Sequence, residues 1–258
     1  MSLEFFEDII KQSKSYTNEI ACHVFGDPLT LSNLGAYLDI IHTHGMKALL
    51  TTSGYYLTQH TSKTLFHPAV KQINISLNAF NKNSNKMSFE SYMESVLALC
   101  DEKARVDRDI FINLRIWNLD EQMSEEEYNT KVFEKLRNHF GIEIDSSSIR
   151  TDTKSSIRLE YKTLLHFDSY FEWPSMQNPL HGHGTCQGLD SHIAILASGA
   201  VVPCCLDSFG IMTLGNLHHS SLDEILDSSR ATQMRDGFTK SICTEELCLH
   251  CSYKDRFA

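Results

Sequence analysis

Short apolar runs alternate with amphipathic segments along the first two thirds of the chain. The runs lie at residues 20–25, 48–52, 73–77 and 110–116. Each is about as long as a typical buried strand. Between them, apolar residues recur every three or four positions, as in Leu34, Leu38 and Ile41, which predicts amphipathic helices. Strands that alternate with helices in this way predict βαβ units and a parallel sheet, so we expect an α/β fold.

Capping residues mark several of the predicted helix ends. Ser2 is a suitable N-cap for a first helix, and the Ser-x-x-Glu sequences that begin at Ser124 and Ser221 are capping boxes. Gly141 follows the last apolar residue of one helix, a position where glycine commonly ends a helix. The helix after Ser221 is predicted to continue to about Met234. No strand precedes the first helix, so the βα series begins as though its first strand were missing.

The pattern is weaker after residue 141. Segments 155–161 and 164–167 are candidate strands, and segment 171–174 has the composition expected of a domain junction. We therefore expect one domain at residues 1–172 and a second at 173–258. The His-Gly-His-Gly sequence at 181–184 favours a surface loop over metal ligation.

The second domain is rich in cysteine. Six of the eight cysteines of the chain lie there, at Cys186, Cys204, Cys205, Cys243, Cys248 and Cys251. A CxxC pair such as Cys248 and Cys251 supplies two sulfurs from one turn of chain, and distant cysteines complete the set of ligands. The spacing therefore predicts a metal or cluster site.

A predicted hairpin brings two of these cysteines together. Segment 193–196 is apolar, and segment 198–202 begins with Ser198-Gly199 and continues with apolar residues. This pattern indicates two short strands joined by a tight turn at Gly199. Such a hairpin would carry Cys186 and Cys204 to the same end. The second domain is thus expected to be a small α+β unit with a β-hairpin.

Charge and hydropathy exclude several classes of partner. The net charge of −10 argues against nucleic acid, because phosphate binding requires a basic surface. The longest apolar runs, such as 110–116, are far too short to cross a bilayer. Nothing at the N-terminus resembles a signal peptide, so we expect a cytoplasmic protein with free thiols rather than disulfides. The residues alone leave zinc and an iron–sulfur cluster as alternatives for the cysteine site.

The end of the chain resembles that of radical S-adenosylmethionine (radical SAM) proteins with a SPASM or twitch-type extension. The matching features are Cys186-x12-Gly199-x4-Cys204, the sequence Leu214-Gly215-Asn216, a Ser-Leu-x-Glu-Ile helix and Cys248-x2-Cys251. The resemblance implies an auxiliary 4Fe-4S cluster on Cys186, Cys204, Cys248 and Cys251. Cys205 and Cys243 are further candidates for these ligand positions. The resemblance also implies that residues 1–172 form a partial TIM-like (β/α) barrel of the radical SAM type.

A second resemblance concerns the loops that follow the predicted strands. Gly26-Asp27-Pro28 is similar to the family's Gly-Gly-Glu-Pro motif, which binds the amino group of the SAM methionine, although Phe25 replaces the first glycine and Asp27 the glutamate. Ser53, Ser76 and Arg115 lie where relatives place polar groups near the SAM ribose and carboxylate. A guanidinium pairs bidentately with a carboxylate, but strand-end capping and an ion pair are alternative roles for these residues.

One departure from the family is large. The CxxxCxxC motif that holds the SAM-cleaving cluster is absent, and Cys22 on an apolar strand cannot replace it. We therefore expect the natural protein to be longer and this chain not to cleave SAM. The missing strand would leave one edge of the sheet unpaired, and an unpaired edge can mediate a homodimer.

The resemblance implies a radical SAM oxidoreductase or maturase. Such an enzyme abstracts hydrogen through a 5′-deoxyadenosyl radical from a peptide, protein or small-molecule substrate. A non-catalytic binding or scaffold protein with a structural zinc or iron–sulfur site is the alternative, and a single-cluster electron carrier or oxygen sensor is a third hypothesis.

Overall fold

The fold is described from a computed structural model, and its described residues are 1–82, 87–106, 109–118, 125–145, 155–168, 170 and 172–257. The chain forms two compact units. The β/α unit comprises Thr17–His23 and Asp27–Tyr170, and the cysteine-rich unit comprises Met1–Tyr16, Val24–Gly26 and Phe171–Ala258. Each unit is described separately.

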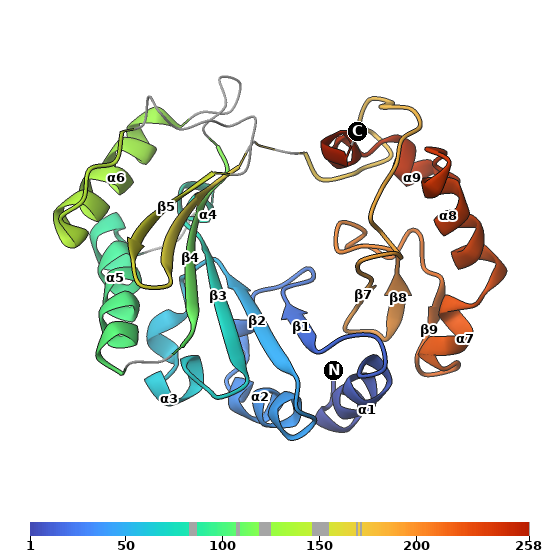
Figure 1. Ribbon diagram of the computed structural model, residues 1–258, viewed down its shortest axis with the longest axis horizontal. Coiled ribbons are helices and arrows are strands. Elements are labelled where there is room, and N and C mark those ends of the chain that lie inside the picture. The colour runs from blue at the N-terminus through green and yellow to red at the C-terminus, as the bar shows by residue number, and fades with distance from the viewer. Residues whose placement is uncertain are drawn as a thin grey trace. The chain divides into compact units, whose positions relative to one another are not determined.

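The β/α unit is built on a six-stranded sheet with the strand order β1-β2-β3-β4-β6-β5 (Figure 1). The strands are β1 (Glu19–Cys22), β2 (Lys47–Thr52), β3 (Val70–Ser76), β4 (Phe111–Ile116), β5 (Ser155–Glu160) and β6 (Thr163–Phe167). Neighbouring strands from β1 through β4 to β6 are parallel, and β5 pairs antiparallel with β6 at the far edge. The predicted α/β class with a parallel sheet is confirmed.

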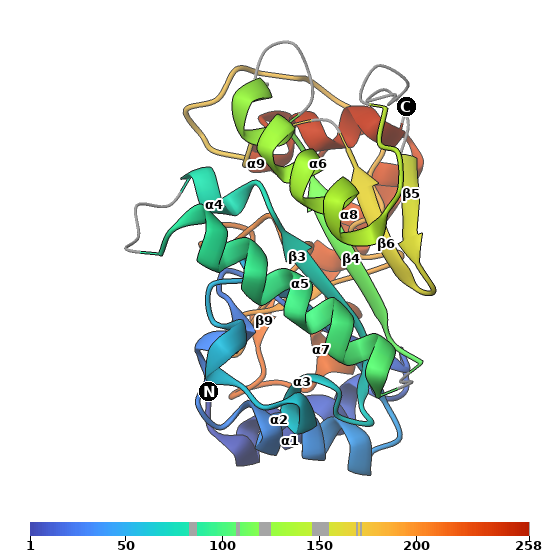
Figure 2. The same cartoon turned by 90° about the vertical axis from the view of Figure 1, so that its left-hand side faces the viewer.

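Helices cover one face of this sheet, as the two views in Figures 1 and 2 show. The helical segments of the unit are η1 (Pro28–Thr30), α2 (Leu34–Thr43), η2 (Leu57–Gln59), α3 (Ser62–Leu65), α4 (Ala79–Lys82), α5 (Phe89–Arg105) and α6 (Glu126–Phe140). The apolar strand residues that face these helices are buried; examples are Leu50, Ile73, Ile75, Ile112 and Leu114, each with 0% exposure. Because strand side chains alternate between faces, the residues between them define the opposite face.

Local signals explain where the longer helices begin and end. The Ser88 side chain accepts a hydrogen bond from the Ser91 amide at the start of α5, and Gly141 ends α6 with φ of 63°. A left-handed residue after the last turn is a common helix stop, and glycine adopts it without a Cβ clash. The predicted capping box at Ser124 lies outside the described residues.

The cysteine-rich unit has little regular structure. Its elements are α1 (Leu3–Ser13), β7 (Ala194–Ile195), β8 (Ala200–Val202), β9 (Gly215–Asn216), α7 (Leu222–Leu226), α8 (Ser229–Thr239), α9 (Glu246–Leu249) and η4 (Ser252–Phe257). Strands β7 and β8 form an antiparallel hairpin, with Gly199 at φ of 84° in its turn. The hairpin and the capping box at Ser221, with both of its hydrogen bonds to Glu224, were predicted correctly.

Two features of this unit differ from the sequence expectations. The helix predicted from Ser221 to about Met234 is divided, because the Ser228 side chain accepts a hydrogen bond from Ala231 N–H and starts α8. Residues 1–16, assigned by sequence to the first domain, group with the C-terminal part of the chain. The physical reason is packing: Ile9 of α1 is buried in the same apolar cluster as Val201, Met212 and Leu222.

Candidate functional sites

Five cysteines of the cysteine-rich unit interact electrostatically with one another. Cys186 precedes β7, Cys204 follows β8, and Cys243, Cys248 and Cys251 lie around α9. The pKa of Cys248 is raised by burial first and then by the charges of Cys204, Cys243, Cys186 and Cys251. The four predicted ligands therefore lie in one region of the unit, and their role as ligands stays a prediction.

Backbone amides surround three of the four predicted ligand sulfurs. The Gly188 amide donates to Cys186 Sγ at 3.4 Å. Backbone hydrogen bonds with Leu206 and Asp207 lower the Cys204 pKa against the effect of burial, and those with Tyr253 and Lys254 do the same for Cys251. An amide two residues after each cysteine thus faces its sulfur. Amide donors stabilise thiolate sulfur and are one of the means by which proteins tune iron–sulfur clusters.

Burial raises the pKa of these thiols, so they stay protonated unless a metal ion or cluster binds them. Burial raises the pKa of Cys204 to about 12 and also raises that of Cys251. Thiols in such surroundings stay protonated, whereas a coordinated thiol is deprotonated. Four half-buried cysteines in one region, three of them with amide donors to their sulfurs, are a donor set that fits an iron–sulfur cluster. Among the described residues, no three His, Cys, Asp or Glu side chains form a group arranged to hold a metal ion.

Close packing around Gly188 supports this arrangement. A Cβ atom built there would lie 3.1 Å from the Pro203 carbonyl oxygen, 3.7 Å from Cys186 Sγ and 3.8 Å from Cys204 Cβ. Gly188 therefore lets the Cys186 segment approach the Cys204 segment closely.

The two further candidates have different surroundings. Burial raises the pKa of Cys205, and no other thiol contributes to that shift. Cys243 is 4% exposed, and its thiol donates to the Gly184 carbonyl at 3.6 Å. Neither sulfur accepts the amide hydrogen bond from a following residue that Cys186, Cys204 and Cys251 share.

Side chains on the helix-free face of the sheet form a second polar region. Ser76 lies opposite Arg115 in the register of β3 and β4, and Arg115 lies opposite His166 in β6. The Arg115 guanidinium also lies over the Trp117 ring, 5.3 Å from its centroid. Two of the predicted SAM-binding residues are thus neighbours at the C-terminal end of parallel strands, where α/β enzymes bind ligands.

Asp27 is held by the end of β2. Its Oδ2 accepts hydrogen bonds from Thr52 Oγ1 at 2.8 Å and from the amide and hydroxyl of Ser53 at 2.8 and 2.7 Å. Its Oδ1 accepts from the Leu29 amide at 3.0 Å. These contacts link Asp27 to Ser53, and they fix the loop that contains Pro28. A direct contact of Asp27 with SAM stays a prediction.

The backbone at Phe25 explains a departure from the family motif. Phe25 occupies the position of the first glycine and has φ of 50°, in the left-handed region that glycine favours. The loop therefore keeps a glycine-like conformation despite the substitution. Gly26 follows at a site where a Cβ atom would meet nothing within 4 Å.

A carboxamide ladder on the helix-free face was not predicted from the sequence. Asn113 Nδ2 donates to Asn74 Oδ1 at 3.0 Å, and Asn74 Nδ2 donates to Thr51 Oγ1 at 3.1 Å. Asn74 and Asn113 are 2% and 6% exposed, and Asn113 Oδ1 is a buried acceptor without a hydrogen-bond partner. The signal in the sequence was an asparagine in the middle of each of two apolar strands.

His23 is a further residue that the sequence did not mark. Its Nδ1 is buried and has no hydrogen-bond partner. Burial first, and the Arg115 charge second, lower the His23 pKa, so the imidazole is neutral at pH 7. Together with Asn113, it offers hydrogen-bonding capacity to a bound molecule.

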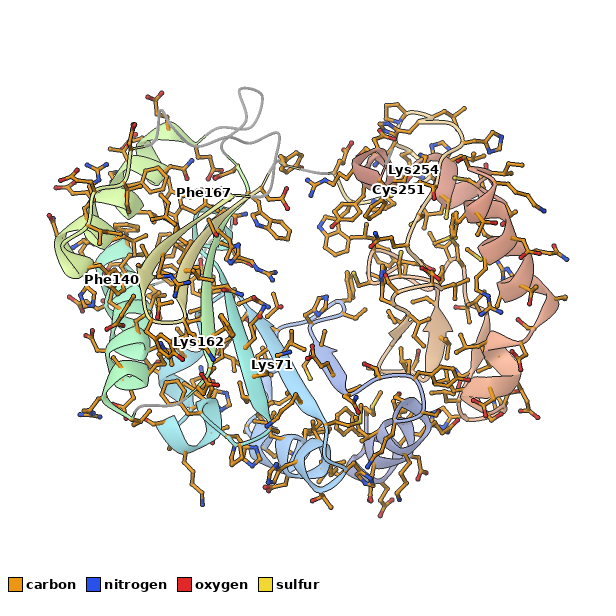
Figure 3. All side chains as sticks on the ribbon, in the orientation of Figure 1. Lys71, Phe140, Lys162, Phe167, Cys251 and Lys254 are labelled. Atoms are coloured by element: carbon orange, nitrogen blue, oxygen red, sulfur yellow. The ribbon has the colours of Figure 1, made fainter. Side chains whose placement is uncertain are left out.

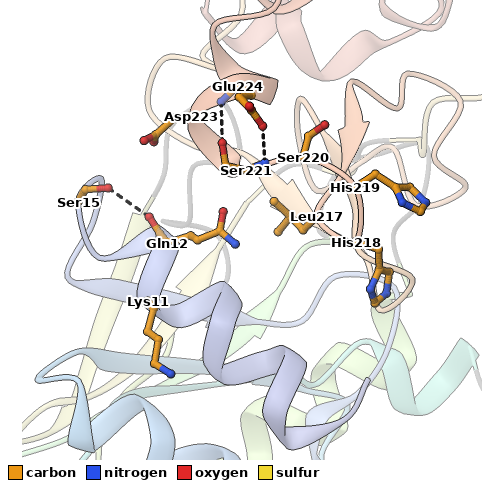
Figure 4. A pocket seen from close by; sticks show the side chains of 10 residues that line it. All are labelled: Lys11, Gln12, Ser15, Leu217, His218, His219, Ser220, Ser221, Asp223 and Glu224. Atoms are coloured by element: carbon orange, nitrogen blue, oxygen red, sulfur yellow. Dashed lines mark hydrogen bonds between the residues drawn. The ribbon is translucent and has the colours of Figure 1, made fainter.

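A separate pocket of about 600 Å³ lies between α1 and the start of α7 (Figure 4). Its lining includes Lys11, Gln12, His218, Asp223 and Glu224. Most of its polar groups already have partners: Gln12 accepts from the Leu222 amide, and Glu224 belongs to the capping box. None of the predicted site residues lines it.

Comparison with known proteins agrees with these sites. Residues 186–252 match the SPASM family, described as an iron–sulfur cluster-binding domain. No curated protein sequence matches the chain. No described helix is both long and apolar enough to span a membrane.

Solved structures share the fold. BtrN in complex with AdoMet and 2-DOIA has a TM-score of 0.52 at 13% identity over 98% of this chain and 80% of that chain. An open conformation of BtrN gives 0.51 at 14% identity, with the same coverage. Native anSMEcpe with bound AdoMet gives 0.51 at 14% identity over 98% of this chain and 77% of that chain.

These neighbours are radical SAM proteins, so the fold of this chain is a radical SAM-type fold. Its C-terminal part is a SPASM-type iron–sulfur cluster-binding domain. The predicted resemblance is confirmed for both parts of the chain.

Proposed function

We propose that this chain is the major part of a radical SAM-type enzyme that holds one auxiliary 4Fe-4S cluster on Cys186, Cys204, Cys248 and Cys251. The observation that best supports the proposal is a feature shared by Cys186, Cys204 and Cys251. The backbone amide two residues after each of these cysteines forms a hydrogen bond with its sulfur. The six-stranded sheet would be the partial TIM-like barrel of this enzyme class.

Each part of the chain has a distinct role in this proposal. The cysteines hold the cluster, which when bound supplies a redox centre or a site for substrate. Burial limits the access of water to the sulfurs, and the amide donors stabilise the negative charge on them. Lys254 is 3% exposed and donates to the Cys251 carbonyl at 2.7 Å, which places a cation beside the ligand segment (Figure 3).

The helix-free face of the sheet would bind SAM and substrate. Gly26, Asp27 and Pro28 would form the loop for the methionine amino group, and Asp27 orients that loop through its bonds to β2. Arg115 would pair with the methionine carboxylate, and Ser53 and Ser76 would supply polar groups near the ribose. SAM, when bound, supplies the 5′-deoxyadenosyl group for hydrogen abstraction.

The substrate would be a peptide, a protein side chain or a small polar molecule. Asn113 Oδ1 and His23 Nδ1 would accept hydrogen bonds from its hydroxyl, amine or amide groups, because both are buried and unpartnered. Edge strand β1 is where we would place a homodimer contact. Nucleic acid is not a proposed partner, given the net charge of −10.

The test is anaerobic reconstitution with iron and sulfide, followed by metal analysis and visible and EPR spectra. We expect about four iron and four sulfide per chain and a broad visible absorption. The Cys205→Ser variant is the matched control, since it removes a neighbouring thiol and should bind the same amount. About one zinc per chain without sulfide would refute the proposal in favour of a structural metal site.

A further inference from the structure

Residues 178–184 run alongside the segment that bears the CxxC pair. The His250 imidazole donates to the Asn178 carbonyl at 2.5 Å, and the His181 amide donates to the Leu249 carbonyl at 2.8 Å. These bonds join the chain just before Cys186 to the chain between Cys248 and Cys251. The sequence indicated only a surface loop for residues 181–184.

Cys243 closes this contact with two hydrogen bonds of its own. Its amide donates to His183 Nδ1 at 3.2 Å, and its thiol donates to the Gly184 carbonyl at 3.6 Å. Gly184 is two residues before Cys186. We call His183, Gly184 and Cys243 the thiol clasp.

The opposite side of Gly184 is also tightly packed. A Cβ atom built on Gly184 would lie 3.2 Å from Cδ of Lys254, and the Lys254 ammonium group donates to the Cys251 carbonyl at 2.7 Å. Gly184 is thus held between Cys243 and a side chain that is bonded to the last ligand segment. Both contacts set the distance between Cys186 and the CxxC pair.

The hydrogen bond of the Cys243 thiol differs from those of the Cys186, Cys204 and Cys251 sulfurs. Cys186 Sγ accepts an amide hydrogen bond, which favours the thiolate, whereas Cys243 Sγ donates to a carbonyl oxygen. The clasp therefore uses Cys243 as a hydrogen-bond donor.

We propose that Cys243 is a positioning residue that holds Cys186 beside Cys248 and Cys251 through the thiol clasp, and that it does not ligate the cluster. This inference rests on the proposed function, because it concerns the same cluster. His183 contributes to the clasp through Nδ1, which accepts a hydrogen bond from the Cys243 amide.

The experiment compares the full chain with its Cys243→Ala, Cys243→Ser and His183→Ala variants, with Cys205→Ala as the matched control. Each is reconstituted anaerobically, and iron content, the EPR spectrum of the reduced cluster and the rate of iron loss to a ferrous chelator are measured. We expect about four iron per chain in every variant and unchanged EPR g-values. Iron loss should be about five- to tenfold faster in Cys243→Ala and His183→Ala. It should be near the parent rate in Cys243→Ser, whose hydroxyl still donates, and in Cys205→Ala.

Two outcomes would overturn the inference. Altered g-values or a loss of iron stoichiometry in Cys243→Ser would show that Cys243 is a ligand. A parental rate of iron loss in Cys243→Ala would show that the thiol clasp does not hold the cluster ligands in place. If Cys243→Ala does not fold by circular dichroism, Cys243→Ser and His183→Ala still decide between these results. Failure of the unchanged chain to bind iron and sulfide would instead refute the proposed function.

Discussion

The β/α unit and the cysteine-rich unit obtain their order from different interactions. Strands of four to seven residues in the β/α unit bury complete apolar rows against helices. Strands of only two or three residues occur in the cysteine-rich unit, where turns, caps and sulfur contacts join long loops. The comparison teaches that hydrophobic packing along continuous strands specifies the first unit, whereas the second has shorter elements around its apolar cluster, and we expect a bound cluster to stabilise it further.

Removal of a ligand thiol should give the largest effect. The Cys186→Ser variant should fall from about four iron to less than one per chain after reconstitution, because a hydroxyl is a poor cluster ligand. Unfolding of the cysteine-rich unit should then begin at a lower temperature, while most β/α signal remains in circular dichroism. A variant that keeps its full iron content would exclude Cys186 as a ligand.

A core substitution in the β/α unit should be costly without any effect on iron. Ile73 is 0% exposed in a central strand, so Ile73→Ala should lower the free energy of unfolding by about 2–5 kcal/mol. Urea denaturation measures this loss, and metal analysis should show parental iron content. The comparison of the two units fails if Ile73→Ala also prevents cluster binding in folded protein.

Asp27 should contribute somewhat less to the same unit. The Asp27→Ala variant loses four accepted hydrogen bonds, and the amides and hydroxyls at the end of β2 must find water instead. We expect a loss of about 2–3 kcal/mol in urea denaturation and weaker SAM binding by calorimetry. Asp27→Asn, which keeps acceptor oxygen, is the control and should lose less stability. Equal stability of Asp27→Ala and the parent would contradict this structural role.

Alanine substitutions at two glycines distinguish the cost of steric crowding from the cost of backbone strain. Gly54 has φ of 88°, and a Cβ there would lie 3.0 Å from the buried ring of Tyr92; Gly141 has φ of 63°, and a Cβ there would meet nothing within 4 Å. Gly141→Ala should therefore cost about 1 kcal/mol, and Gly54→Ala about 1–2 kcal/mol more. Thermal and urea unfolding measure both values. A cost for Gly54→Ala no larger than that for Gly141→Ala would contradict the packing at Tyr92.

The last prediction is a pH dependence in the β/α unit, which acts only at alkaline pH. Burial raises the Cys22 pKa from 9.0 to about 11, so the folded state keeps a thiol proton that the unfolded state releases. The stabilisation is complete below pH 9 and is lost as the pH rises through about 11. Urea denaturation at pH 8 to 11 should show a steeper decline for the parent than for Cys22→Ala. Equal slopes would exclude the buried thiol as a cause.

The sequence by itself predicted most of the elements, and its assignment of the ligand cysteines stays a prediction. Period-two and period-3.6 apolar patterns predicted the parallel sheet and its helices, because burial acts on each face of a strand or helix independently of distant residues. The spacing around Gly199 and the CxxC pair predicted the hairpin and the cluster site, since a tight turn and a two-residue gap fix local geometry.

Only the tertiary structure decided which polar groups meet. The three bonds of Asp27 to Thr52 and Ser53, and the carboxamide ladder from Asn113 to Thr51, join positions far apart along the chain. The packing of Ile9 with the C-terminal core is equally non-local. The contact of the Cys243 thiol with the Gly184 carbonyl is also non-local, whereas the amide that faces Cys186 Sγ comes from Gly188 in the same segment.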